Sequence, residues 1–298
     1  MTSSPTVRAD RSALAERVAA LSPRRRRWLR FLRSLPLDPY SLGRPLDEPG
    51  EDDVIVCGCP RTGSSLLAAA LFQPPQCISV MEPWDGMRLA PAPLFDSLRT
   101  ELAMTGQLTR GRLDVPELLA SGRVRWWPEG EVHVPVDHHE DSVVAVKWPG
   151  YWVYLDLLPA TKFVVTLRHP AEVIASFKAE GGRAALGLQR ETRFNSRLNH
   201  ALESATADPA LRRVLLFDHV HSQLLPHLER PGVFVVRYER WQSDADGLLR
   251  DLGDFLGCDL SAPAVRIEPR QARAGLDDRD RELIATRCRT AAALGYDL

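Results

Sequence analysis

Short, almost wholly apolar runs alternate with helical patterns from residue 53 onward, and this alternation restricts the fold more than any other feature of the chain. Four of the runs are rich in β-branched residues: 54–57, 143–146, 163–167 and 233–236. Continuous apolar runs of this length are typical of strands that are buried on both faces, as in a parallel sheet covered by helices. We therefore expect an α/β fold of three layers with a central parallel sheet.

The clearest helical pattern follows the last of these runs. Apolar residues recur at helical spacing from Ala245 to Leu256, and Gly257 comes directly after them. Glycine is common at this position because it adopts the left-handed conformation that ends many helices. The pattern predicts a helix that faces the core and ends at Gly257. The segment 78–81, apolar except for Ser79, predicts one more short strand.

The first part of the chain differs from the rest. Residues 1–50 hold ten arginines and five acidic residues, with an arginine-rich run at 24–33. We predict a basic N-terminal helical arm followed by one domain, residues 51–298. The arm either contacts a membrane surface or an anionic partner, or is a solvated helix that packs on the domain, and charge runs favour the second interpretation. Residues 84–140, rich in Pro, Gly and Trp, are the least regular and are expected to form an insertion that shapes a pocket.

The composition excludes several classes of protein. Hydrophobic residues make up 44% and charged residues 26%, and the formal net charge of -1 argues against a protein that mainly binds nucleic acid. No stretch approaches the ~20 apolar residues of a membrane span, and the N-terminus lacks the apolar core of a signal peptide. The five cysteines show neither a disulfide framework nor a zinc motif. We expect a cytoplasmic protein with no metal site and no integral membrane contact.

A phosphate-binding loop is predicted directly after the first strand. Residues 54–67 combine a buried strand, a turn that contains glycine and the start of a helix. The unpaired N–H groups and the dipole of a helix N-terminus attract anions, and Gly63 lets the backbone approach the ligand closely. Arg61 adds a positive charge, and Ser64 and Ser65 add hydroxyl donors. The alternative, an ordinary turn capped by serines, explains the serines but not Arg61.

The loop differs from that of proteins that hydrolyse nucleoside triphosphates. In the pattern G-x-x-x-x-G-K-[ST] a lysine reaches the outer phosphates, and Ser64 occupies that position here. The strand at 163–167 ends in Arg168 instead of the aspartate that would support magnesium. The sequence therefore predicts a site for a nucleotide phosphate that relies on arginine and hydroxyl donors.

A second anion-binding pair is predicted where the strand 163–167 ends. Arg168 follows the strand, and Pro170 suits the first turn of the next helix. Ser176 lies on that helix, eight positions after Arg168. A guanidinium and a hydroxyl placed in this way would bind a second phosphate. The alternative is that Arg168 only pairs with Glu172 on the surface.

Together these segments resemble the sulfotransferase superfamily, which has a P-loop-type fold and uses 3'-phosphoadenosine 5'-phosphosulfate (PAPS) as its donor. The resemblance covers most of residues 53–257. Arg168 and Ser176 look like the family's 3'-phosphate pair, and Tyr238 with Glu239 is similar to its strand-end landmark near the nucleotide. The segment after the first strand looks like the 5'-phosphosulfate loop, which implies that five residues contact the donor: Arg61, Thr62, Gly63, Ser64 and Ser65.

The resemblance also implies catalytic residues. Glu82 is similar to the glutamate base of the tyrosylprotein and trehalose-type sulfotransferases, although it is alternatively a loop glutamate paired with Arg88. Arg61 would stabilise negative charge on the departing 3',5'-bisphosphate. Lys147 begins the element that corresponds to the family's Lys-x-His, and it is expected to contact the sulfuryl group or the leaving phosphate. Otherwise Lys147 is a surface lysine at the end of a strand.

The chain departs from the cytosolic small-molecule sulfotransferases in this element, which reads Lys147-Trp148-Pro149 and lacks the histidine base. That departure strengthens the assignment of Glu82. Three loop histidines are the alternative bases: His133, His138 and His139. The family's C-terminal Arg-Lys-Gly element is not visible, so the candidates for that contact with the 3'-phosphate are Arg270 and Arg273.

The function that these features imply is transfer of a sulfuryl group from PAPS to a hydroxyl of a small-molecule or natural-product acceptor. A sulfuryl group carries less negative charge than a phosphoryl group, so the reaction does not require a metal. Two alternatives remain open: a P-loop-type kinase, and a nucleotide-binding adaptor without turnover. The sequence does not settle the acceptor or the oligomeric state.

Overall fold

The computed structural model describes residues 46–87, 89–108, 134–189, 195–260 and 275–298. The predicted helical arm therefore lies outside the described residues except for its last five positions. Residues 43–298 form one compact unit. No helix in the described part of this unit is long and apolar enough to cross a membrane.

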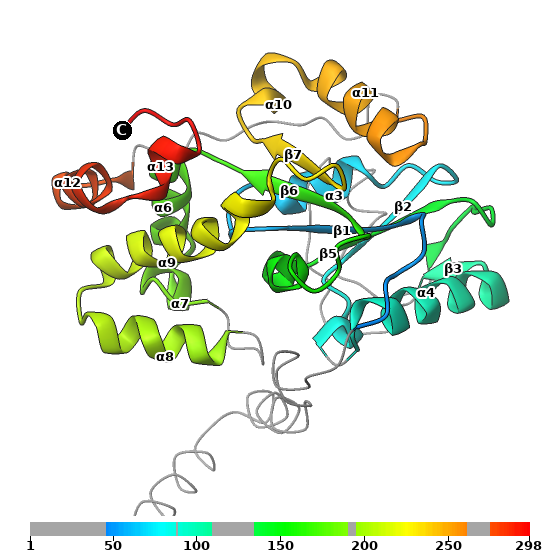
Figure 1. Ribbon diagram of the computed structural model, residues 1–298, viewed down its shortest axis with the longest axis horizontal. Helices are drawn as coiled ribbons and strands as arrows, with labels where there is room; N and C mark the ends of the chain where they lie inside the picture. Colours follow the sequence, from blue (N-terminus) through cyan, green and yellow to red (C-terminus); the bar gives the residue numbers. More distant parts are fainter. Residues whose placement is uncertain (1–45, 88, 109–133, 190–194, 261–274) are drawn as a thin grey trace, which may run out of the picture. The chain divides into compact units, whose positions relative to one another are not determined.

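A five-stranded sheet forms the centre of this unit (Figure 1). The strand order is β2-β5-β1-β6-β7, and every pairing in it is parallel. Each strand lies within one residue of its predicted bounds, so the predicted α/β class with a central parallel sheet is confirmed. The strands are β1 (Asp53–Gly58), β2 (Cys77–Met81), β5 (Val143–Lys147), β6 (Lys162–Leu167) and β7 (Val233–Arg237).

Helices cover both faces of the sheet (Figure 1). Successive side chains of a strand point to opposite faces, and β1 follows this rule. Val54 and Val56 pack in one cluster with Leu67 of α3 (Ser64–Ala70) and Leu248 of α11 (Ala245–Leu256), whereas the other face of β1 meets η3 (Pro149–Tyr154) and α9 (Pro209–Leu224). The helices of the described residues are α3 (Ser64–Ala70), η2 (Trp84–Met87), α4 (Pro91–Thr105), η3 (Pro149–Tyr154), α6 (Pro170–Glu180), α7 (Gly182–Ala185), α8 (Ser196–Ala205), α9 (Pro209–Leu224), η4 (Leu225–His227), α10 (Arg240–Ser243), α11 (Ala245–Leu256), α12 (Asp278–Arg287) and α13 (Thr290–Ala293).

The predicted helix at 245–256 is confirmed as α11, and Gly257 ends it with a φ of 82°. By contrast, α4 lies in the segment that the sequence analysis describes as least regular. Its prolines at positions 91 and 93 fall in the first turn, where a missing N–H removes no intrahelical hydrogen bond. Leu94, Leu98 and Leu102 recur every four residues and are buried, and this spacing is the signal that identifies the helix.

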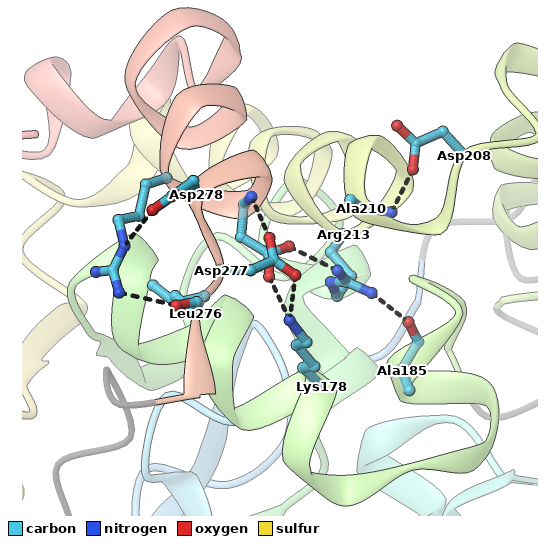
Figure 2. Close-up of polar contacts among 10 residues, drawn as sticks. Lys178, Ala185, Asp208, Ala210, Arg213, Leu276, Asp277 and Asp278 are labelled. Carbon is cyan, nitrogen blue, oxygen red and sulfur yellow. Dashed lines mark hydrogen bonds and ion pairs between the residues drawn. The ribbon is translucent and has the colours of Figure 1, made fainter.

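Helix α6, which carries Ser176, is anchored to α9 and α12 by charged side chains (Figure 2). Asp280 is fully buried and accepts from Arg213 at 2.6 Å and from Lys178 at 2.9 Å. Lys178 also pairs with Asp277 at 2.6 Å, and this hydrogen bond lowers the pKa of Asp277 to about 2. Because a buried charge that loses its partner is costly, these contacts fix the three helices relative to one another.

Candidate active site

The residues predicted to be functional gather at the carboxyl ends of adjacent strands. β1 lies between β5 and β6; Lys147 is the last residue of β5, and Arg61 and Arg168 lie in the segments that follow β1 and β6. β2 pairs with β5 so that Met81 faces Lys147, which places Glu82 at the same edge. In open parallel sheets, ligands bind at the carboxyl ends of the strands. They bind at the point where the connections from neighbouring strands run to opposite sides of the sheet.

The loop between β1 and α3 has an unusual backbone. Arg61 has a φ of 75° and Gly63 a φ of 96°, both in the left-handed region. A Cβ atom on Gly63 would lie 2.4 Å from the ring of Tyr238, so glycine is required by the close approach as well as by the dihedral angle. Among the described side chains none caps α3 at Gly63, so the first N–H groups of this helix are available to an anion.

Thr62 anchors this loop to β6. Its hydroxyl donates to the carbonyl of Cys59 at 2.6 Å and lies 2.6 Å from the hydroxyl of Thr166. Both threonines are buried. These hydrogen bonds show that Thr62 stabilises the conformation of the loop. Its contact with the donor stays a prediction. Thr166 was not among the predicted site residues; its signal in the sequence is that it is the one polar residue of the run 163–167.

Glu82, Lys147 and Ser65 form a hydrogen-bonded triad. The Nζ of Lys147 lies 2.7 Å from the Oε1 of Glu82 and 3.1 Å from the Oγ of Ser65. The backbone N–H of Glu82 also donates to the carbonyl of Lys147 at 2.8 Å. Lys147 is only 2% exposed, so its interpretation as a surface lysine is wrong. A buried charge is costly unless it is paired, and the ion pair with Lys147 fixes the Glu82 side chain next to the loop.

Arg61 and Glu82 share an unusual backbone conformation. Within the described chain they are the only residues other than glycine with a positive φ, 75° for Arg61 and 49° for Glu82. Such conformations are strained, and strain of this kind is concentrated at functional sites. Both residues are among the three catalytic candidates that the family resemblance implies, and their catalytic roles stay predictions.

The strain at position 61 leads to a measurable expectation. Arg61→Gly and Arg61→Ala both remove the guanidinium, but only alanine keeps a Cβ atom in the left-handed region. We expect the glycine variant to exceed the alanine variant by about 1 kcal/mol in free energy of unfolding, or roughly 2–4 °C in Tm. Thermal melts of the two purified variants measure the difference. Equal stabilities would show that Arg61 is not strained.

Arg61 and Arg168 connect the loop to α6. The Nε of Arg61 donates to the Oγ of Ser176 at 3.0 Å, and its Nη1 pairs with the half-exposed Glu180 at 2.8 Å. Arg168 donates to the carbonyl of Arg61 at 3.3 Å and pairs with Glu172 at 3.1 Å. The predicted alternative of an Arg168–Glu172 pair is therefore present, but both side chains are buried and do not lie on the surface.

Tyr238 contacts both the loop and Arg168. The guanidinium carbon of Arg168 is 4.0 Å from the centroid of the Tyr238 ring, and the same ring limits the space at Gly63. Tyr238 is 7% exposed. A cation above an aromatic face is an attractive contact, so the ring helps to orient Arg168 beside the loop.

The loop histidines lie elsewhere. His138 and His139 precede β5 and line a cavity of about 620 Å³ with Arg99, at the amino end of the sheet. The two ends of the five-residue strand β5 are about 13 Å apart, so neither ring is close to Glu82. The other predicted alternatives lie outside the described residues: Arg88, His133, Arg270 and Arg273.

The cysteines do not supply a nucleophile at this site. Burial raises the pKa of the thiols of Cys57, Cys59 and Cys77, which keeps them protonated and unreactive.

In the part of the chain that the structure describes, no group of three or more His, Cys, Asp or Glu side chains is placed to hold a metal ion.

Comparison with protein families decides the class of this site. Residues 53–262, more than half of the chain, match the model described as "Sulfotransferase family". The chain belongs to the sulfotransferase family. The superfamily and the enzyme class predicted from the sequence are therefore confirmed. The residues of this sulfotransferase that match the family model include the loop, the triad, Arg168 and Tyr238. A comparison with curated proteins gives no match.

Solved structures similar to this sulfotransferase come from bacteria and a mammal. A sulfotransferase from Alicyclobacillus acidocaldarius is 16% identical over 85% of this chain and 98% of its own, with a TM-score of 0.44. The sulfotransferase domain of the Synechococcus PCC 7002 olefin synthase is 19% identical over 86% and 98%, with a TM-score of 0.45. A mouse sulfotransferase complexed with PAP is 14% identical over 84% and 68%, with a TM-score of 0.35. The family assignment rests on the family model and not on these likenesses.

Proposed function

We propose that this sulfotransferase moves the sulfuryl group of PAPS to a hydroxyl of a small-molecule or natural-product acceptor, with Glu82 as the general base. The observation that carries the proposal is the triad of Glu82, Lys147 and Ser65. It places a carboxylate, held by a buried ammonium, directly beside a loop suited to a phosphate.

The residues present fit a nucleotide with phosphates at two positions. Ser64, Ser65 and the first N–H groups of α3 suit the 5'-phosphosulfate, because hydroxyl and amide donors converge there with Lys147. Arg168 and Ser176 suit the 3'-phosphate, and both are at least nine-tenths buried near Arg61. PAPS supplies an activated sulfuryl group attached to a good leaving group.

The chain's own groups account for the proton and the charge. Glu82 takes the proton of the acceptor hydroxyl as the new S–O bond forms, and the S–O bond to the departing phosphate breaks at the same time. Lys147, bonded to both Glu82 and Ser65, holds the base beside the reacting group. Arg61 and the loop amides stabilise the negative charge that develops on the departing phosphate oxygen.

Transfer of labelled sulfate tests this proposal. We expect the purified protein to move ³⁵S from PAPS to at least one member of a panel of phenols, aliphatic alcohols and sugars. The matched assay uses γ-³²P-ATP with magnesium and the same panel, and we expect no transfer from it. Phosphoryl transfer without sulfuryl transfer would favour the kinase alternative, and tight PAPS binding without any transfer would favour the adaptor.

A further inference from the structure

Glu239 follows Tyr238 at the end of β7 and takes no part in the proposed chemistry. Its Oε1 accepts from the backbone N–H of His169 at 2.8 Å, and its Oε2 accepts from the hydroxyl of Tyr296 at 3.3 Å. His169 directly follows Arg168 in the chain. Glu239 therefore connects Tyr296, a residue beyond α13, to the turn that carries Arg168.

His169 also holds the start of α6. Its Nδ1 accepts from the backbone N–H of Ala171 at 3.1 Å and caps the helix. Because Nδ1 is an acceptor, the hydrogen of the neutral ring is on Nε2, which lies 2.9 Å from the carbonyl oxygen of Asp297. The two ring nitrogens of His169 thus link the helix start to residues near Tyr296.

We call residues 294–297 the 294–297 segment. Besides the hydrogen bond between Asp297 and His169, the segment contacts the end of β7. Arg237 donates to the first carbonyl of the segment at 2.6 Å, and its guanidinium lies 5.1 Å from the centroid of the Tyr296 ring. The Tyr296 ring also meets the His169 ring edge to face at 5.4 Å. The segment is therefore held by β7 on one side and by the Arg168–His169 turn on the other.

The hydroxyl of Tyr296 acts as a hydrogen-bond donor to Glu239. Burial, together with the nearby carboxylate of Glu239, raises the pKa of Tyr296. The hydroxyl therefore keeps its proton at neutral pH and donates to Glu239.

We propose that the 294–297 segment is a positioning element for recognition of the donor's 3'-phosphate, acting through Glu239 and His169 on Arg168. The inference rests on the proposed function, because it takes Arg168 as the ligand of that phosphate. Tyr238 and Glu172 orient the guanidinium of Arg168, and Glu239 fixes the backbone from which this side chain extends. A small movement of that backbone moves the guanidinium away from the phosphate.

A difference between two nucleotides separates positioning from general stability. Adenosine 3',5'-bisphosphate and adenosine 5'-monophosphate differ only in the 3'-phosphate, so the ratio of their Kd values measures recognition of that group. We expect Tyr296→Ala to reduce this ratio about tenfold relative to wild type, because it loses both the hydrogen bond to Glu239 and the ring contacts with His169 and Arg237. Tyr296→Phe, which keeps the ring and loses the hydroxyl, should reduce it by a smaller factor. Calorimetric titration at one ionic strength gives both constants.

The control is Asp208→Ala, which removes the side chain that caps the start of α9 by accepting from Ala210 (Figure 2) and so destabilises the protein at a site outside the segment. This control should keep the wild-type ratio. If Tyr296→Ala and Tyr296→Phe also keep the ratio, the segment is only structural and the inference is wrong. If Tyr296→Ala does not fold, the Tyr296→Phe ratio decides. A wild-type protein that does not distinguish the two nucleotides would overturn the assignment of Arg168 and the inference with it.

Discussion

Glu82→Gln is expected to lower kcat by about 10² to 10⁴ while leaving the affinity for adenosine 3',5'-bisphosphate within about twofold of wild type. The amide cannot take a proton from the acceptor hydroxyl, but its oxygen still accepts from Lys147. The geometry of the triad and the loop is therefore retained. Turnover with the best acceptor of the panel, together with a calorimetric titration of the bisphosphate, measures both quantities.

The matched control for this change is Glu51→Gln, which alters the same charge at an exposed position before β1, at the amino end of the sheet. We expect it to retain wild-type turnover. A Glu82→Gln protein as active as this control would show that another group removes the proton, and the assignment of the base would be wrong.

Lys147→Met is the second change with a large expected effect. It removes the ammonium that holds Glu82 and Ser65 and leaves the Glu82 carboxylate, 12% exposed, without that partner. We expect kcat to fall about 10²- to 10³-fold and the free energy of unfolding to fall by about 3 kcal/mol. Chemical denaturation and steady-state kinetics measure the two losses.

The double variant Lys147→Met/Glu82→Gln makes this expectation sharper. If the two residues act as one unit, the double variant should lose little more activity than the worse single variant. It should also be more stable than Lys147→Met alone by about 1–2 kcal/mol, because a neutral amide replaces the carboxylate that has lost its ammonium. Additive losses in both quantities would mean that the two side chains act separately.

The sheet was predictable because its strands are buried on both faces. A strand such as 143–146 is continuously apolar, and that pattern is independent of what packs against it. Helix α4 was not predictable by the same reasoning, because its prolines are normally signs of irregular structure. Only their position in the first turn, which the structure shows, makes them compatible with a helix.

The site was predictable in its residues but not in its connections. Arg61 and Glu82 follow strands and Lys147 ends one, all at the carboxyl edge of the sheet, and this placement can be inferred from the sequence. The hydrogen bond between Lys147 and Glu82 depends on the pairing of β2 with β5, which no local pattern encodes. The link from Tyr296 to Glu239 joins residues 57 positions apart and was missed for the same reason.

The most direct test of the donor site is a thermal melt with adenosine 3',5'-bisphosphate, with magnesium-ATP and without ligand, on wild type and on Arg168→Ala. At about 100 times its Kd, a ligand adds ~2.7 kcal/mol, which raises Tm by roughly 5 °C in a domain of this size. We predict such a shift with the bisphosphate, a smaller one with magnesium-ATP, and no bisphosphate shift in Arg168→Ala relative to its own ligand-free melt. A larger shift with magnesium-ATP, or no bisphosphate shift in wild type, would contradict the assignment of this site.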